Sequence, residues 1–352
     1  MHHLPRLLVG PAALAATLAA LVGAAVAAWA GPFVNSAHGN ASLMPLGCGT
    51  CHVGHGMPDT KMMSGTQEAM CLQCHSDAGA RATAVTKGLL TASPNLPNVR
   101  ADFLKASRHP LSSVGGANAV TCSDCHGVHY GVKVTPPPAN QNPTQVTQYT
   151  NARGRTTTQY SLCYRCHGST AAPGNGLVDV ERLLKLSNPS FHPVLGKAPG
   201  TDVPSLLQPY STQSILGCTH CHGSDQATGA RGPHGSAFSP ILKANYSTTD
   251  GQTESASRYD LCYRCHNRNT VLSEQHNFDL HRKHIVDKKA PCRACHNSHG
   301  STQYPHLIDF DPSTVFNNSQ GQLRYTSTGP RRGSCSLRCH NKNHVNESYP
   351  DD

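Results

Sequence analysis

Sixteen cysteines and eight of the 23 histidines in this 352-residue chain form one repeated pattern. The cysteines fall into eight pairs, and a histidine directly follows each pair. In the eighth, Cys335 and Cys339 before His340, the two cysteines are one residue further apart than in the others. The seven C-x-x-C-H motifs are Cys48/Cys51/His52, Cys71/Cys74/His75, Cys122/Cys125/His126, Cys163/Cys166/His167, Cys218/Cys221/His222, Cys262/Cys265/His266 and Cys292/Cys295/His296.

This spacing is typical of c-type haem attachment. Two thiols on one turn of the chain form thioethers with the vinyl groups of a porphyrin, and the next histidine becomes the proximal iron ligand. Disulfides, zinc ribbons and thioredoxin-like motifs also use paired cysteines, but none of them requires a histidine after every pair. The sequence therefore predicts eight covalently attached haem c groups, with a bulge that accommodates the extra residue of the eighth motif.

Further histidines are candidates for the second, distal ligand of each iron. A histidine three residues after a proximal ligand lies on the same side of a helical segment, about 5–6 Å away. We therefore expect His55, His129 and His299 to bind a different haem from that of their own motif. His276, His306 and His344 are interpreted as surface or propionate-binding residues, and His220, a variable residue inside a motif, is not expected to be a ligand. The distal candidates are His38 and His55, His109 and His129, His192 and His234, and His299 with either His284, which we prefer, or His281.

The motifs divide the chain into four predicted di-haem units, at residues 31–95, 96–180, 181–270 and 271–352. Hydrophobic residues make up 37% of the chain, and the only tryptophan is Trp29. This is a small supply for an ordinary hydrophobic core. We expect haem groups to fill the interior, as metals and disulfides do in other core-poor domains. The predicted fold is mostly irregular, with short α-helices at the motifs.

Residues 1–30 have the features of a signal peptide, with a basic start, an apolar stretch and Ala28-Trp29-Ala30 before Gly31. An uncleaved membrane anchor is the alternative, because the stretch could span a bilayer. We expect an exported chain with no membrane span after signal removal, located outside the cell or at its surface, with the periplasm as the alternative.

The +9 charge does not indicate nucleic acid binding, because haem propionates would offset it.

The pairing of C-x-x-C-H-x-x-H-G with a later L-C-x-x-C-H resembles the doubled-C-x-x-C-H multihaem cytochromes c. Ser36-Ala37-His38-Gly39 and the single C-x-x-x-C-H motif are similar to features of secreted cytochromes of metal-reducing microbes that polymerise into extracellular filaments. In such filaments a histidine of one subunit can bind a haem of the next. The resemblance implies self-association, with His38 as the candidate for this role, and redox proteins or extracellular electron acceptors as partners.

Two classes of function remain. In the first, every iron has two histidine ligands and the chain carries electrons, as a filament, as a periplasmic shuttle or as the electron-entry subunit of a reductase. In the second, the chain is a multihaem reductase of nitrite, hydroxylamine or tetrathionate, which needs an iron with an open or unusual ligand position. No motif has lysine in place of histidine, and the candidate ligands suffice for eight irons. The sequence therefore favours an electron-transfer protein without catalytic residues.

Overall fold

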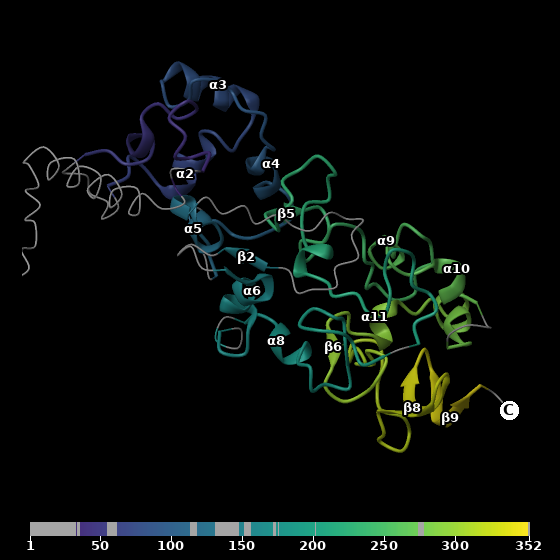
Figure 1. Cartoon of the computed structure of the whole chain (residues 1–352). Coiled ribbons are helices and arrows are strands. Elements are labelled where there is room, and N and C mark those ends of the chain that lie inside the picture. Colours follow the sequence, from purple (N-terminus) through teal and green to yellow (C-terminus); the bar gives the residue numbers. More distant parts are fainter. Residues whose placement is uncertain are drawn as a thin grey trace, which may run out of the picture.

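The computed structural model describes residues 33, 36–54, 62–112, 118–130, 148–150, 156–171, 174, 176–200, 202–273 and 278–350. The chain forms an elongated body in which its segments follow one another roughly in sequence order (Figure 1). Helices α2 and α3 lie at one end, and strands β8 and β9 lie at the other. The predicted signal peptide lies outside the described residues. No described helix has the length and apolar character that crossing a bilayer requires.

All described helices are short, and most begin at or beside a cysteine motif. Isolated helices of this length are unstable in water, so they depend on contacts with the rest of the molecule. Side-chain caps help to start several of them. For example, Thr66 accepts from the Ala69 backbone N–H and Asp77 accepts from that of Ala80. The helices are η1 (Gly47–Thr50), α2 (Gln67–Leu72), α3 (Ala78–Thr86), α4 (Val99–Phe103), α5 (Cys122–Cys125), η3 (Val128–Tyr130), α6 (Gln159–His167), α8 (Val180–Leu183), η4 (Cys218–His220), α9 (Asp260–Tyr263), α10 (Arg268–Val271), η5 (Lys283–Asp287) and α11 (Cys292–Cys295).

The strands form three two-stranded pairings and one three-stranded antiparallel sheet with the order β7-β8-β9. Both turns of that sheet have two residues. His340 and Asn341 in the second turn have φ values of 44° and 62°, as a type I′ hairpin requires. The strands are β1 (Ser107–Arg108), β2 (Gln148–Thr150), β3 (Thr156–Thr158), β4 (Ser190–Phe191), β5 (Gly235–Ser236), β6 (Gly300–Ser301), β7 (Arg324–Gly329), β8 (Arg332–Cys339) and β9 (Lys342–Tyr349).

Two of the short pairings repeat the same arrangement, and we call them clasps. In the first clasp β1 pairs with β5, and the His109 N–H donates to the His234 carbonyl. In the second clasp β4 pairs with β6, and the His192 N–H donates to the His299 carbonyl. Each clasp therefore brings together two histidines that are far apart in the sequence.

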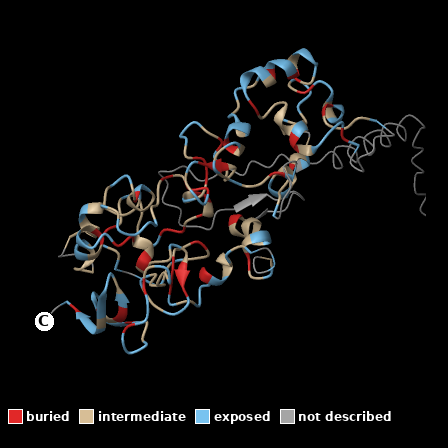
Figure 2. Cartoon of the chain, turned by 180° about the vertical axis from the view of Figure 1, so that it is seen from behind, coloured by how far each residue is buried: buried red, intermediate tan, exposed pale blue. Residues whose placement is uncertain are grey.

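The apolar core consists of small, separate clusters. One contains Leu184, Phe191 and Val194, and another contains Met44 and Leu90. Buried residues occur in short stretches along the whole body (Figure 2). The prediction of a mostly irregular chain with short helices is confirmed, whereas the sheet of β7, β8 and β9 was not expected from the sequence.

The second clasp leaves no room for a side chain at Gly300. A Cβ atom there would lie 2.2 Å from the Leu183 carbonyl oxygen and 2.9 Å from that of Ser190. We expect Gly300→Ala to lower the free energy of unfolding by about 1–3 kcal/mol, because the backbone must move. Guanidinium unfolding of the purified protein measures this. Gly200→Ala is the control, since a Cβ atom there meets nothing within 4 Å. Equal effects of the two substitutions would contradict the prediction.

Candidate functional site

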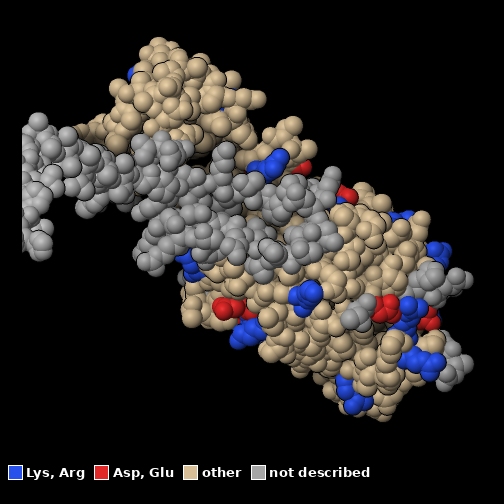
Figure 3. All heavy atoms as spheres, in the orientation of Figure 1, with Lys and Arg blue, Asp and Glu red and all other residues tan. Residues whose placement is uncertain are grey.

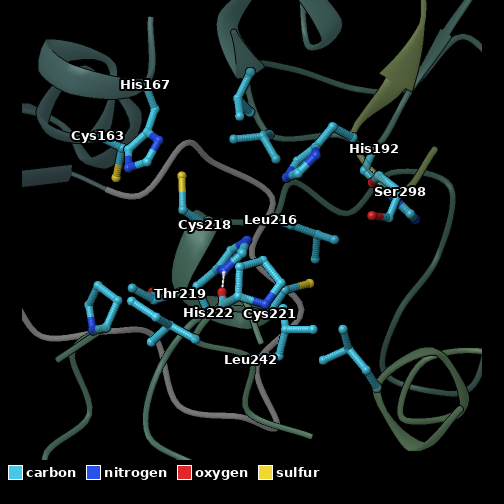
Figure 4. Close-up of a pocket in the computed structure, with 18 of the residues that line it drawn as sticks. Cys163, His167, His192, Leu216, Cys218, Thr219, Cys221, His222, Leu242 and Ser298 are labelled. Atoms are coloured by element: carbon cyan, nitrogen blue, oxygen red, sulfur yellow. Dashed lines mark hydrogen bonds between the residues drawn. The ribbon is translucent and has the colours of Figure 1, made fainter. Parts of the chain in front are cut away.

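A continuous cavity of about 3540 Å³ runs through the protein. Its volume is several times the ~300–1,000 Å³ of a pocket for one small molecule. All sixteen cysteines and all eight motif histidines line it. Figure 4 looks into part of it, where Cys163 and His167 of α6 lie on one side and His192 and Ser298 on the other. The cysteine motifs therefore share one connected space.

Among the described residues, six pairs of histidine rings face one another around this cavity. Every pair joins one motif histidine to one histidine outside the motifs, and no ring occurs in two pairs. Their ring centroids are separated by 5.9 Å in His38–His75, 5.9 Å in His52–His129, 6.4 Å in His109–His167, 5.9 Å in His126–His234, 6.2 Å in His222–His299 and 6.2 Å in His281–His296.

These separations match two imidazoles that bind one metal ion from opposite sides. A bond between a metal and an imidazole nitrogen is about 2 Å long, and the ring centre lies roughly 1 Å behind the nitrogen, which places the two centroids about 6 Å apart. The angle between the ring planes ranges from 2° to 55°. This range is compatible with axial ligation, because each ring can turn about its metal–nitrogen bond.

Two motif histidines remain, His266 and His340. Burial lowers the pKa of His266 to about 4, and the nearby His192 and His296 add to the shift. Burial also lowers the pKa of His284, and the positive charges of Lys283 and His340 add to that shift. The eighth site differs from the others, because the His340 Nε2 atom lies 2.8 Å from an Asp250 carboxylate oxygen.

Backbone hydrogen bonds orient several of these rings. The Nδ1 atom of His109 lies 2.7 Å from the Pro233 carbonyl oxygen, that of His222 lies 3.0 Å from the Pro240 oxygen, and that of His192 contacts the Ser298 oxygen. The Nδ1 atoms of His284 and His296 also contact backbone carbonyl oxygens. Because a carbonyl oxygen can only accept, each Nδ1 carries the proton and each Nε2 keeps its lone pair for a metal.

Burial also keeps these imidazoles neutral. It lowers the pKa of His75, His234, His296 and His299 to about 4, and neighbouring histidines add to the effect. The pKa of His281 falls further, to about 3, for the same reasons. At pH 7 these rings are therefore unprotonated, which is the state that binds metal.

The thiols are free and lie close to one another across the unit boundaries. None of the sixteen cysteines forms a disulfide. A hydrogen bond with Cys122 raises the pKa of the Cys71 thiol, and burial adds to this shift. The same contact joins Cys163 to Cys218 and Cys262 to Cys292. The first cysteine of one motif therefore meets the first cysteine of the next at three boundaries.

The eighth motif lies on a strand rather than a helix, which explains its spacing. Residues four apart lie on one face of a strand, whereas residues three apart lie on one face of a helix. Cys335 and Cys339 of β8 both pack against the apolar cluster that contains Leu337. The expected bulge is absent from β8, since the register shift opposite Ser336 places the extra residue in β9. The additional residue is thus what a strand needs to present both thiols together.

The structure places most of the predicted distal candidates beside motif histidines. His129 and His299 face motif histidines other than those three residues before them. His38 faces His75 of its own chain. His55 lies outside the described residues.

The fourth unit departs from the sequence interpretation. His281 and His284 were treated as alternatives, but His281 faces His296 while His284 lies near His340. Phe278 contacts both rings, at centroid distances of 5.2 Å and 5.7 Å. The sequence count did not reveal this, because His55 completes a set of eight distal candidates with only one of the two.

A family model described as a doubled CXXCH motif matches residues 43–80, which contain the first two motifs. Neither curated proteins nor solved structures gave a match. The chain thus carries a signature of multihaem c-type cytochromes, its CxxCH motifs indicate covalently bound haem c, and its general role is electron transfer.

The geometry fits that cofactor. Paired imidazoles beside paired thiols in one cavity are the groups that a haem c held by two histidines would require. In the described part of the chain, no cluster of three or more His, Cys, Asp or Glu side chains is arranged to hold a metal ion. A haem iron with two protein ligands needs only two such side chains.

Ser205 provides a test of one ligand contact. Its buried hydroxyl lies 2.9 Å from the His266 Nδ1 atom. Loss of an acceptor makes an imidazole a weaker donor to ferric iron. We therefore expect Ser205→Ala to raise the reduction potential of the haem attached at Cys262 and Cys265, while the other haems keep theirs.

Spectroelectrochemical titration measures this shift. Ser313→Ala is the control, because that exposed hydroxyl contacts Asp311 in a surface turn. The prediction fails if no potential moves in Ser205→Ala or if all potentials move together.

Proposed function

We propose that this chain is an octahaem c-type cytochrome that carries electrons along a series of haems, each held by two histidines. The observation that carries the proposal is the one-to-one pairing of motif histidines with other histidines at about 6 Å. For the two remaining motif histidines we assign His192 to His266 and His284 to His340, because each assigned histidine interacts electrostatically with its partner and has no motif histidine facing it in the described ring pairs. These eight pairs suffice for eight irons without His55.

The pairing follows a regular rule along the chain. In the first three units, the first motif takes its partner from the unit that follows: His129 for His52, His234 for His126 and His299 for His222. The second motif takes its partner from upstream in its own unit. In the last unit, where no further unit follows in this sequence, His281 lies upstream and faces His296.

Cysteine contacts support an order of the haems that follows the sequence. Between units, the thiols of Cys71 and Cys122 meet, as do two equivalent pairs. Within units, burial raises the pKa of one cysteine in each of four pairs, and the thiol of the other cysteine adds to the shift. These pairs are Cys51/Cys74, Cys125/Cys166, Cys221/Cys265 and Cys295/Cys335. The haems would therefore form a single series along the elongated body.

Two axial imidazoles per iron favour a conduit over a reductase. A reductase needs an iron with a position for substrate, and each proposed pair closes both positions. The eighth site is where an exception would arise, because Asp250 contacts the His340 Nε2 atom. A nitrogen- or sulfur-oxyanion reductase would be supported by an open iron at that site.

We also propose that the chain is exported and exchanges electrons with redox proteins or extracellular acceptors. The support is the sequence of residues 1–30 together with c-type attachment. A filament of this chain would have to form through surface contacts, since His38 faces its own chain. On the face in Figure 3, lysine and arginine side chains lie scattered rather than in one stripe, unlike a nucleic-acid-binding surface.

The haem count and the spin state test this function together. We expect the intact mass of the secreted protein to exceed that of its polypeptide by eight haems. Electron paramagnetic resonance (EPR) of the oxidised protein should show low-spin ferric haem alone, because two imidazoles give a strong ligand field. A stoichiometric high-spin signal would support the reductase, and seven haems would remove the eighth motif from the series.

The fourth unit provides a sharper test of the ligand pairs. We expect His281→Ala and His284→Ala each to convert one haem to the high-spin state without loss of covalent haem, because each removes one axial ligand. His344→Ala is the matched control, since His344 lines the same cavity and contacts Glu347. EPR and haem quantification distinguish the outcomes. A high-spin signal in His344→Ala, with none in His284→Ala, would overturn the assignment of the eighth haem.

A further inference from the structure

Gln67 holds two consecutive haem motifs together across the first unit boundary. Its side-chain oxygen accepts from the Ser123 backbone N–H at 2.8 Å, and its side-chain nitrogen donates to the Ser123 hydroxyl at 3.0 Å. Ser123 directly follows Cys122, whose thiol contacts Cys71. The glutamine therefore lies beside the meeting point of two haem attachment sites.

The second boundary repeats this contact. Gln159 accepts from the Thr219 backbone N–H at 3.3 Å and donates to the Thr219 hydroxyl at 2.9 Å. Both residues are buried, with 3% of Gln159 and 5% of Thr219 exposed. Thr219 follows Cys218, whose thiol contacts Cys163. Two boundaries that are distant in the sequence thus have the same pair of hydrogen bonds.

Helix geometry explains why glutamine stands at these positions. Each glutamine lies four residues before a cysteine on the same helix, Gln67 before Cys71 on α2 and Gln159 before Cys163 on α6. Residues four apart share one helix face, so amide and thiol point to the same neighbour. The N–H groups in the first turn of a short helix have no partner within that helix, and a glutamine oxygen satisfies one of them.

The third boundary uses other residues. Arg258 stands four residues before Cys262, and its guanidinium contacts Gln252. Arg293 follows Cys292 and donates to the Asp309 carbonyl oxygen at 2.9 Å. The thiols of Cys262 and Cys292 still meet there. The glutamine contact is therefore a feature of two boundaries and is separable from the cysteine contact itself.

We propose that Gln67 and Gln159 are positioning residues that fix the separation and mutual orientation of the two haems on either side of their boundaries. The inference rests on the proposed function, because it requires haem at both motifs. Each glutamine acts through its hydrogen bonds to the cysteine-bearing turn of the next motif. Without these hydrogen bonds the two attachment turns can move apart, and electron exchange between the two haems slows.

Gln159→Met in the full-length, haem-loaded protein is the principal test. Methionine keeps the length of the side chain and removes both hydrogen bonds. We expect eight low-spin haems, as in the unmodified protein, but a smaller exciton signal in the Soret circular dichroism (CD) spectrum, which depends on the separation and orientation of neighbouring haems. Gln67→Met should lower the signal independently, and the two losses should add, because the sites share no partner.

Matched variants separate positioning from general damage. Gln213→Met alters an exposed glutamine away from the boundaries and should leave the signal unchanged. Thr219→Ser keeps both partner groups of Gln159 and should also leave the signal unchanged, whereas Thr219→Val removes the hydroxyl and should lower it. An unchanged Soret signal in Gln159→Met, with eight low-spin haems present, would overturn this inference alone. Missing haems in the unmodified protein would instead overturn the proposed function.

Discussion

The distance between two imidazoles that share one metal ion is the constraint on which the architecture depends. Rings about 6 Å apart leave room for one metal ion between their nearest nitrogen atoms. The paired rings and all sixteen cysteines line one cavity. Beside this cavity, the apolar clusters of the described residues are small. The clasps act as spacers, because backbone pairing fixes His109 beside His234 and His192 beside His299.

The offset between motif and partner makes the four units interdependent. A first-motif histidine such as His126 finds its partner, His234, in the following unit, so an isolated unit would lack a ligand. Glutamine contacts and thiol contacts cross the same boundaries. Repeat proteins gain stability from such nearest-neighbour interfaces. Three of the proposed ligand pairs therefore join one predicted unit to the next.

The sequence predicted the chemistry of the site more fully than it predicted the geometry of the site. Motif spacing is local and reports directly on thioether formation, so the attachment sites could be read from the residues. The identity of each distal ligand depends on long-range pairing, such as the clasp that positions His192, and spacing alone does not report it. The sheet of β7, β8 and β9 was missed because its strands are rich in polar residues. The wider spacing of Cys335 and Cys339 was the one indication of a strand at this place in the sequence, because residues four apart fit the two-residue period of a strand.

The fourth unit departs from the pairing of the first three. In those units the partner of the first motif histidine lies in the next unit, whereas His281 precedes its partner His296 within the fourth unit. His284 follows three residues later, in the π-helical segment η5. Phe278 contacts both rings, at centroid distances of 5.2 Å and 5.7 Å. One short segment thus presents two histidines to the cavity, which is the arrangement that two distal ligands at this end would need.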